Sequence, residues 1–109
     1  MQRSEAARDL FKHYLANRKD LADRLLADDF TFTSPRDDHI DKATYFDRCW
    51  PQPPAFRDIV IERLFESGDE VVVGYRAEKT DGGSFRNLEL LRFRVEKIIS
   101  VEVYFGRDG

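Results

Sequence analysis

The N-terminal third of the chain carries the spacing of amphipathic helices. Apolar residues recur every three or four positions in the first segment, as Ala7, Leu10, Phe11, Tyr14 and Leu15. This spacing places them on one helical face, so we predict a first helix from Ser4, its N-cap, to about Asn17. A second helix, with three leucines on its buried side, is predicted to end near Asp28-Asp29.

Further along, the helical period gives way to alternation of apolar and polar residues. These runs, separated by turn residues, predict five strands at 30–34, 56–66, 71–80, 84–95 and 98–105. Gly68 and Gly82-Gly83 lie in turns between them, where glycine tolerates a positive φ. Asp41 is a suitable N-cap for one short helix at 42–49, and prolines make residues 50–54 a rigid loop.

This order of elements predicts an α+β fold in a single domain that spans residues 1–109. Three N-terminal helices would pack on one strongly curved, mostly antiparallel sheet. A chain of 109 residues is long enough for one modest core. A hydrophobic content of 41%, with 13% aromatic residues, is typical of a globular domain.

Charge and hydropathy narrow the range of partners. The 18 Lys and Arg against 21 Asp and Glu give a formal charge of −3, so no general field attracts nucleic acid. No apolar run approaches the roughly 20 residues of a bilayer span, and no signal peptide is evident. The single Cys49 cannot form an internal disulfide. We expect a cytoplasmic chain that contacts neither nucleic acid nor membrane. The sequence contains no metal-site spacing and no phosphate loop, so we expect no metal and no cofactor.

The predicted strand 84–95 carries apolar residues on both faces. The face assigned to the core is Phe85, Asn87, Glu89, Leu91, Phe93 and Val95. Because the helices can cover only one face of the sheet, apolar residues on the other face indicate a partner. We therefore predict a homodimer through the outer sheet face, formed by Leu88, Leu90, Arg92 and Tyr104. The alternative is a set of scattered surface leucines, which are common.

Two stretches of the chain resemble a known family. Residues 25–32, Leu-Leu-Ala-Asp-Asp-Phe-Thr-Phe, resemble the start of the first strand in the SnoaL-like proteins of the nuclear transport factor 2-like superfamily. Residues 92–94, 96–99 and 104–106 resemble the closing hairpin of that family, and the order of elements is similar over essentially the whole chain. The resemblance implies a cone-shaped α+β barrel with an apolar cavity near the short helix. It implies that the cavity is lined by Tyr14, Phe32, Ser34, Phe46, Trp50, Tyr75, Asn87, Glu89, Leu91, Val101, Val103 and Phe105.

Within this superfamily the chain is distantly similar to ketosteroid isomerase. By motif, Tyr14 falls at the tyrosine of that branch and Glu89 near its second acid. The position of the catalytic base, directly before the proline that ends the first strand, holds Ser34. A serine hydroxyl without an adjacent base is a poor proton acceptor at neutral pH. This departure argues against ordinary ketosteroid isomerase activity.

The charged residues after Pro35 offer a replacement base. Histidine is the side chain best suited to proton transfer near neutral pH, and Asp38 would orient His39 and stabilise its charged form. We predict this pair as the catalytic residues at the rim of the cavity. The alternative is a solvated turn in which Asp37 is a turn former, Asp41 caps the helix and His39 is exposed.

Glu89 has two interpretations as well. A charged, unpaired carboxylate between Leu91 and Phe93 on an inward face would be costly. It is therefore either held neutral as a hydrogen-bond donor to a ligand, or paired with Asn87, Tyr14 or an arginine in a structural network.

Three functions remain open from the sequence. The first is a cavity enzyme that acts by proton transfer on a small, largely apolar substrate, in an isomerisation, dehydration or hydrolysis. The second is a non-catalytic module that binds a small apolar molecule in the same cavity. The third is a dimeric accessory protein whose cavity is filled by its own aromatic side chains. The fold alone does not choose between them.

Overall fold

A computed structural model describes residues 2–51 and 54–108 of the chain. The helices are α1 (Arg3–Leu15), α2 (Lys19–Leu25) and α3 (Lys42–Cys49). The strands are β1 (Leu26–Ser34), β2 (Asp37–Asp41), β3 (Phe56–Ser67), β4 (Glu70–Lys79), β5 (Ser84–Arg94) and β6 (Lys97–Asp108). Gln52 and Pro53, which belong to the predicted loop at 50–54, lie outside the described residues.

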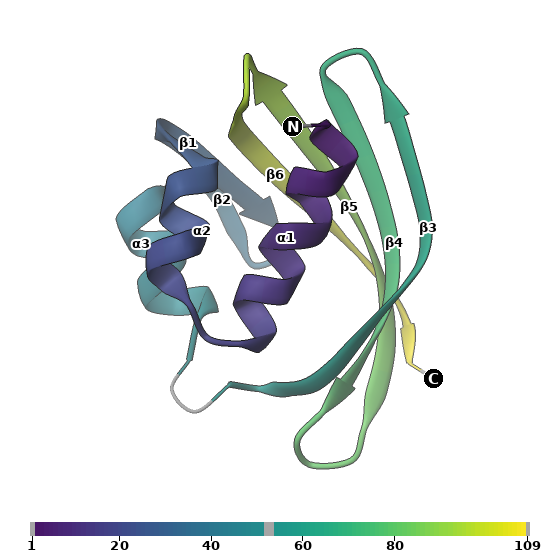
Figure 1. Ribbon diagram of the computed structural model, residues 1–109. Coiled ribbons are helices and arrows are strands. Elements are labelled where there is room, and N and C mark those ends of the chain that lie inside the picture. Colours follow the sequence, from purple (N-terminus) through teal and green to yellow (C-terminus); the bar gives the residue numbers. More distant parts are fainter. Residues whose placement is uncertain (1, 52–53, 109) are drawn as a thin grey trace.

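The six strands form one curved, open sheet in the order β2-β1-β6-β5-β4-β3. Neighbouring strands are antiparallel except β1 and β6, which are parallel. Figure 1 shows the sheet curving around α1, with all three helices on its concave side and none on its outer face. The predicted α+β fold, with helices on a curved and mostly antiparallel sheet, is confirmed.

The core lies between α1 and the concave face of the central strands. Ala7, Leu10 and Phe11 of the predicted apolar stripe are buried, and they face the inward residues of β4 and β5. Val71, Val73 and Leu91 are fully buried there, and each such side chain stabilises the fold by about 1.5–3 kcal/mol. No helix in the described ranges is long and apolar enough to cross a membrane.

The helix boundaries differ from the sequence prediction at two points. Helix α1 begins at Arg3, so Ser4 is not the N-cap. The backbone N–H of Ser4 donates to Oε1 of Glu66 at 2.9 Å. Helix α2 ends at Leu25, several residues before the predicted end, because Leu26 already pairs with β6. Strand pairing in the sheet therefore overrides the local helical pattern.

The charged segment after Pro35 contains a strand that the sequence analysis missed. Residues 37–41 form β2, which pairs with β1 through Phe32 and Ile40. Asp41 caps α3 as predicted, because its side chain accepts from the Thr44 N–H at 2.9 Å.

Val95, predicted on the core face, was wrongly assigned. It lies in the turn between β5 and β6 with φ 59° and is 79% exposed. Its position in a left-handed turn ends the alternation of β5, so the inward face of that strand stops at Phe93.

Candidate functional site

A cavity of about 300 Å³ lies between α1, α3 and the concave face of the sheet. A cavity of this size is at the small end of the range for small-molecule sites. Its walls are mainly apolar, from Leu10, Phe11, Phe32, Phe56, Ile59, Val103 and Phe105. The few polar groups that face it therefore decide its chemistry.

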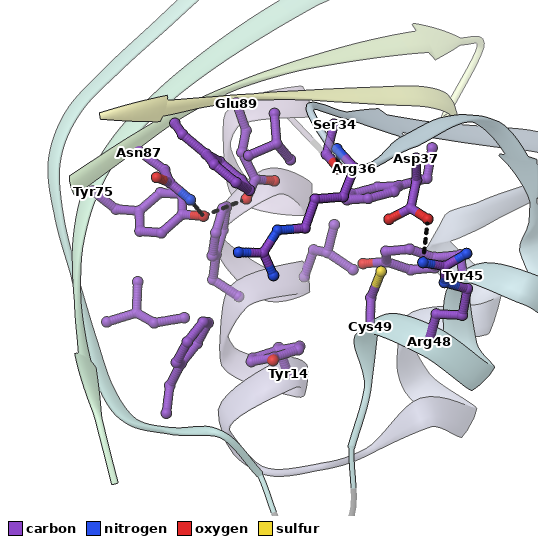
Figure 2. Close-up of a pocket in the computed structure, with 17 residues that line it drawn as sticks. Tyr14, Ser34, Arg36, Asp37, Tyr45, Arg48, Cys49, Tyr75, Asn87 and Glu89 are labelled. Atoms are coloured by element: carbon purple, nitrogen blue, oxygen red, sulfur yellow. Dashed lines mark hydrogen bonds and ion pairs between the residues drawn. The ribbon is translucent and has the colours of Figure 1, made fainter. Parts of the chain in front are cut away.

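Three of these polar groups form a connected network on β4 and β5. Tyr75 and Asn87 are directly opposite in the register of the two strands, and Asn87 Nδ2 donates to Tyr75 Oη at 3.2 Å. The Tyr75 hydroxyl in turn donates to Glu89 Oε2 at 2.6 Å, a short charge-assisted bond (Figure 2). Both β5 residues line the cavity because residues two apart on a strand share a face. The network fixes the orientation of the carboxylate.

The environment of Glu89 shifts its protonation. Burial against protein raises its pKa to about 7, while the hydrogen bond from Tyr75 opposes this shift by favouring the charged form. Burial, together with the nearby Glu89 charge, raises the pKa of Tyr75 well above its usual value. Near neutral pH the tyrosine therefore remains a donor, while Glu89 is present in both its protonated and its ionised form.

Tyr14 reaches the cavity from α1. Burial raises its pKa to about 12, so it stays a neutral phenol. Its ring packs edge-on against Trp50 at 4.9 Å between centroids and tilted against Phe56 at 5.5 Å. This packing holds the side chain of Tyr14 in place.

The mouth of the cavity is charged. It is lined by Ser34, Arg36, Asp37, Arg48 and Cys49. The carboxylate of Asp37 is only 8% exposed and lies 2.9 Å from Nη2 of Arg48. Burial raises the pKa of the Cys49 thiol to about 11, so it is not a thiolate at neutral pH and is a poor nucleophile.

Seven of the ten site residues predicted from the sequence line the cavity. They are Tyr14, Phe32, Ser34, Tyr75, Asn87, Glu89 and Phe105. Trp50 does not line it: the side chain is 2% exposed and packs in the core against the rings of Tyr45 and Phe46. Phe46, Leu91 and Val101, which the resemblance also placed on the wall, are not part of the lining.

The predicted catalytic pair lies away from the cavity. His39 Nδ1 is 2.6 Å from Asp38 Oδ1, so the two side chains do pair. They are 69% and 88% exposed, however, and neither lines the cavity. The pair sits on β2, where the backbone of His39 is left-handed (φ 50°) and the register with β1 is irregular between Phe32 and Ser34.

Sequence reasoning missed the arginines and the cysteine at the mouth. Tyr45, Arg48 and Cys49 all line the cavity, and their spacing of three and four residues places them on one face of α3. That spacing was readable from the sequence. The side-chain direction of Arg36, in the turn between β1 and β2, was not.

In the described ranges no group of three or more His, Cys, Asp and Glu side chains is arranged to hold a metal ion.

Comparison with known proteins identifies the family. Residues 7–101 match the SnoaL-like domain, and the chain therefore belongs to the SnoaL-like family. No protein in the curated set matches.

Solved structures share the fold at low sequence identity. An NTF2-like protein of unknown function from Cytophaga hutchinsonii is 19% identical, with a TM-score of 0.80, covering 96% of this chain and 90% of that one. A "putative ketosteroid isomerase" from Kribbella flavida is 17% identical, with a TM-score of 0.81 and coverage of 96% and 78%. An uncharacterized cystatin fold protein from Novosphingobium aromaticivorans is 19% identical, with a TM-score of 0.79 and coverage of 95% and 98%.

Proposed function

We propose that this protein is an enzyme that transfers a proton within a small, largely apolar carbonyl compound, with Glu89 as the base. The observation that carries the proposal is the oriented carboxylate itself. Glu89 faces an apolar cavity, is fixed by Tyr75, and has a pKa of about 7. A base poised near the working pH is the most effective kind.

In the proposed reaction Glu89 is the base and Tyr14 is the hydrogen-bond donor. The Glu89 carboxylate takes a proton from the carbon beside the carbonyl; the C–H bond breaks and its electron pair moves to the carbonyl oxygen as an enolate. Tyr14, a neutral phenol that lines the cavity, donates a hydrogen bond to that oxygen. In a β,γ-unsaturated substrate, Glu89 returns the proton to the γ-carbon and the double bond moves into conjugation, which gives an isomer. In a β-hydroxy substrate, the C–O bond to the β-hydroxyl breaks and Glu89 returns the proton to the departing hydroxyl, which leaves as water in a dehydration. A positioned base of this kind contributes about 10²–10⁴ in rate.

Glu89 replaces the base that the sequence lacks at Ser34. The Ser34 hydroxyl accepts from the Arg36 backbone N–H at 3.1 Å, and no carboxylate is adjacent to it in the chain. His39 with Asp38 stays an alternative base only for a substrate that reaches outside the cavity. The similar fold of the Kribbella protein is in keeping with carbonyl chemistry.

The second candidate is a non-catalytic module that binds a small apolar molecule in the same cavity. It is favoured by one observation. The bond from Tyr75 already satisfies one oxygen of Glu89 within the chain, as in a purely structural network.

Hydrogen exchange on β-tetralone, a small apolar ketone with acidic α-protons, tests the first candidate. We expect the protein to speed the exchange of those protons in heavy water, measured by NMR, and Glu89→Gln to reduce the rate about 10²-fold or more. Glu96→Gln, an exposed glutamate in the β5–β6 turn, is the matched control and should keep the full rate.

Two other outcomes have a defined meaning. If β-tetralone binds but neither wild type nor Glu89→Gln accelerates exchange, the non-catalytic module is favoured. If Glu89→Gln keeps the rate and His39→Ala removes it, Glu89 is not the base and the exposed pair is.

A further inference from the structure

Arg36 stands apart from the other charged groups at the mouth of the cavity. It lies between β1 and β2 and lines the cavity. Its guanidinium is 5.7 Å from the centre of the Phe105 ring, in the range of a cation–π contact. In Figure 2 the side chain extends from the β1–β2 turn across the cavity, away from the Asp37–Arg48 pair.

The charges at the mouth do not cancel. Asp37 is paired with Arg48 at 2.9 Å, so these two neutralise each other. Among the side chains described in residues 2–51 and 54–106, no carboxylate lies within 4.0 Å of the Arg36 guanidinium. Arg36 therefore presents to the cavity a positive charge that no ion pair among these side chains neutralises.

Glu89 is the acidic group inside the cavity. In Figure 2 it lies on the far side from the Asp37–Arg48 pair, and the Arg36 side chain extends toward that side. A negatively charged ligand group would be attracted by the guanidinium of Arg36 and repelled by the ionised form of Glu89. The anion of a ligand is therefore expected beside Arg36 and not beside Glu89.

We propose that Arg36 is an oxyanion subsite, and that the ligand of this cavity is an amphipathic anion with an apolar body and one carboxylate or sulfonate at the end that faces the mouth. This inference rests on the proposed function only in using the same cavity. A guanidinium presents paired N–H donors that match the geometry of a carboxylate or sulfonate. Its stacking on Phe105 limits its motion, so less freedom is lost when the anion binds.

This arrangement would also serve the proposed reaction. With its anion held by Arg36, the apolar body of the ligand occupies the same cavity that Glu89 lines. Binding energy from the non-reacting end then positions the reacting carbon. Arg36 would be a binding residue, with no proton to give or take.

Two dyes that differ by a single group test the subsite. Anilinonaphthalene sulfonate carries the anion, and phenylnaphthylamine is the same ring system without it. Both become fluorescent in apolar sites, so affinities follow from titration. We expect Arg36→Gln to weaken the sulfonate dye about tenfold and the neutral dye less than twofold.

The control variants separate this subsite from net charge. Arg8→Gln removes the same charge from an exposed position on α1 that does not line the cavity, and should leave both affinities unchanged. Arg36→Lys should keep part of the preference for the sulfonate dye. Methyl NMR shifts of Ile59 and Val103, which line the cavity, place the dye inside it.

The outcomes are decisive in each direction. The proposal is overturned if Arg36→Gln changes the two dyes equally, if it changes neither, or if wild type binds neither dye in the cavity. Because the dyes undergo no reaction, failure of the subsite and failure of Glu89 as a base are read from different experiments.

Discussion

The buried position of Glu89 disfavours the ionised form of its carboxyl group. Burial raises its pKa from 4.5 to about 7, although the Tyr75 hydroxyl partly compensates. Between these two values the unfolded chain has lost its proton and the folded chain has kept it. Because the folded state then binds more protons, stability falls as pH rises from about 4.5 to about 7. A raised pKa at a cavity wall is what the proposed proton-transfer role requires.

Replacing the carboxylate by an amide should therefore stabilise the protein at high pH. We expect Glu89→Gln to exceed wild type in free energy of unfolding by about 1–3 kcal/mol near pH 8, since one pKa unit corresponds to about 1.36 kcal/mol. Near pH 4 Glu89 is largely neutral in both states, so the difference should nearly vanish. Urea unfolding at the two pH values measures this. Glu96→Gln is the control, and an equal loss of stability by Glu89→Gln at both pH values would contradict the assignment.

At the scale of elements, the end of β6 sets the geometry of the site. β5 has an irregular register between Phe85 and Asn87, and there the Gly106 N–H donates to Asn87 Oδ1 at 3.3 Å. A Cβ atom on Gly106 would overlap the backbone carbonyl of Arg86. Glycine thus allows the two strands to approach closely beside Asn87, which in turn holds Tyr75.

Gly106→Ala should disturb both the strand pairing and the cavity. We expect a loss of about 1–3 kcal/mol in unfolding free energy, because the overlap is with backbone, which cannot rotate away. We also expect weaker dye binding, because Phe105 and Asn87 line the cavity. Gly83→Ala is the matched control: its nearest neighbour is a side-chain oxygen of Asp81 at 3.4 Å. A Gly106→Ala variant as stable as Gly83→Ala would show that the close approach is dispensable.

The elements also show what the sequence could predict. Alternation along β4 and β5 determines which residues face inward, so Tyr75, Asn87 and Glu89 were placed on the cavity side correctly. Strand β2 was missed because Asp-Asp-His-Ile-Asp has no alternation and is extended only through its pairing with β1. Trp50 was predicted on the cavity wall, but it is the C-cap residue of α3, and its backbone angles (φ −118°, ψ 69°) set the direction of its side chain. The spacing of apolar residues in the sequence does not predict these angles. The direction of Arg36 could not be predicted because the geometry of the turn between β1 and β2 determines it.

At the scale of the whole molecule, the outer face of the sheet lacks a covering layer (Figure 1). Leu88 and Tyr104 are 41% and 53% exposed on it, beside a groove of about 280 Å³ that Gly74 helps to form. Two arginines on this face are paired, with Arg92 2.9 Å from Glu70 and Arg86 3.0 Å from Glu62. A face with exposed apolar side chains and paired charges is suited to a partner of the same kind.

We propose that a second copy of the chain covers this face. A two-fold interface buries the same surface patch of both subunits, so Leu88→Lys would place two like charges in one interface and leave them partly desolvated. We expect sedimentation equilibrium to show a dimer for wild type. The dissociation constant of the dimer should be at least about tenfold higher for Leu88→Lys. Val95→Lys is the control, because Val95 is more exposed than Leu88 but lies in the β5–β6 turn; it should leave the dimer intact. A monomeric wild type at high protein concentration, or a Leu88→Lys dimer of unchanged strength, would mean that the outer face is simply solvated. Dye binding would distinguish an effect on the dimer from an effect on the cavity. Because each subunit has its own cavity on the concave side of the sheet, the Leu88→Lys monomer should still bind the dyes.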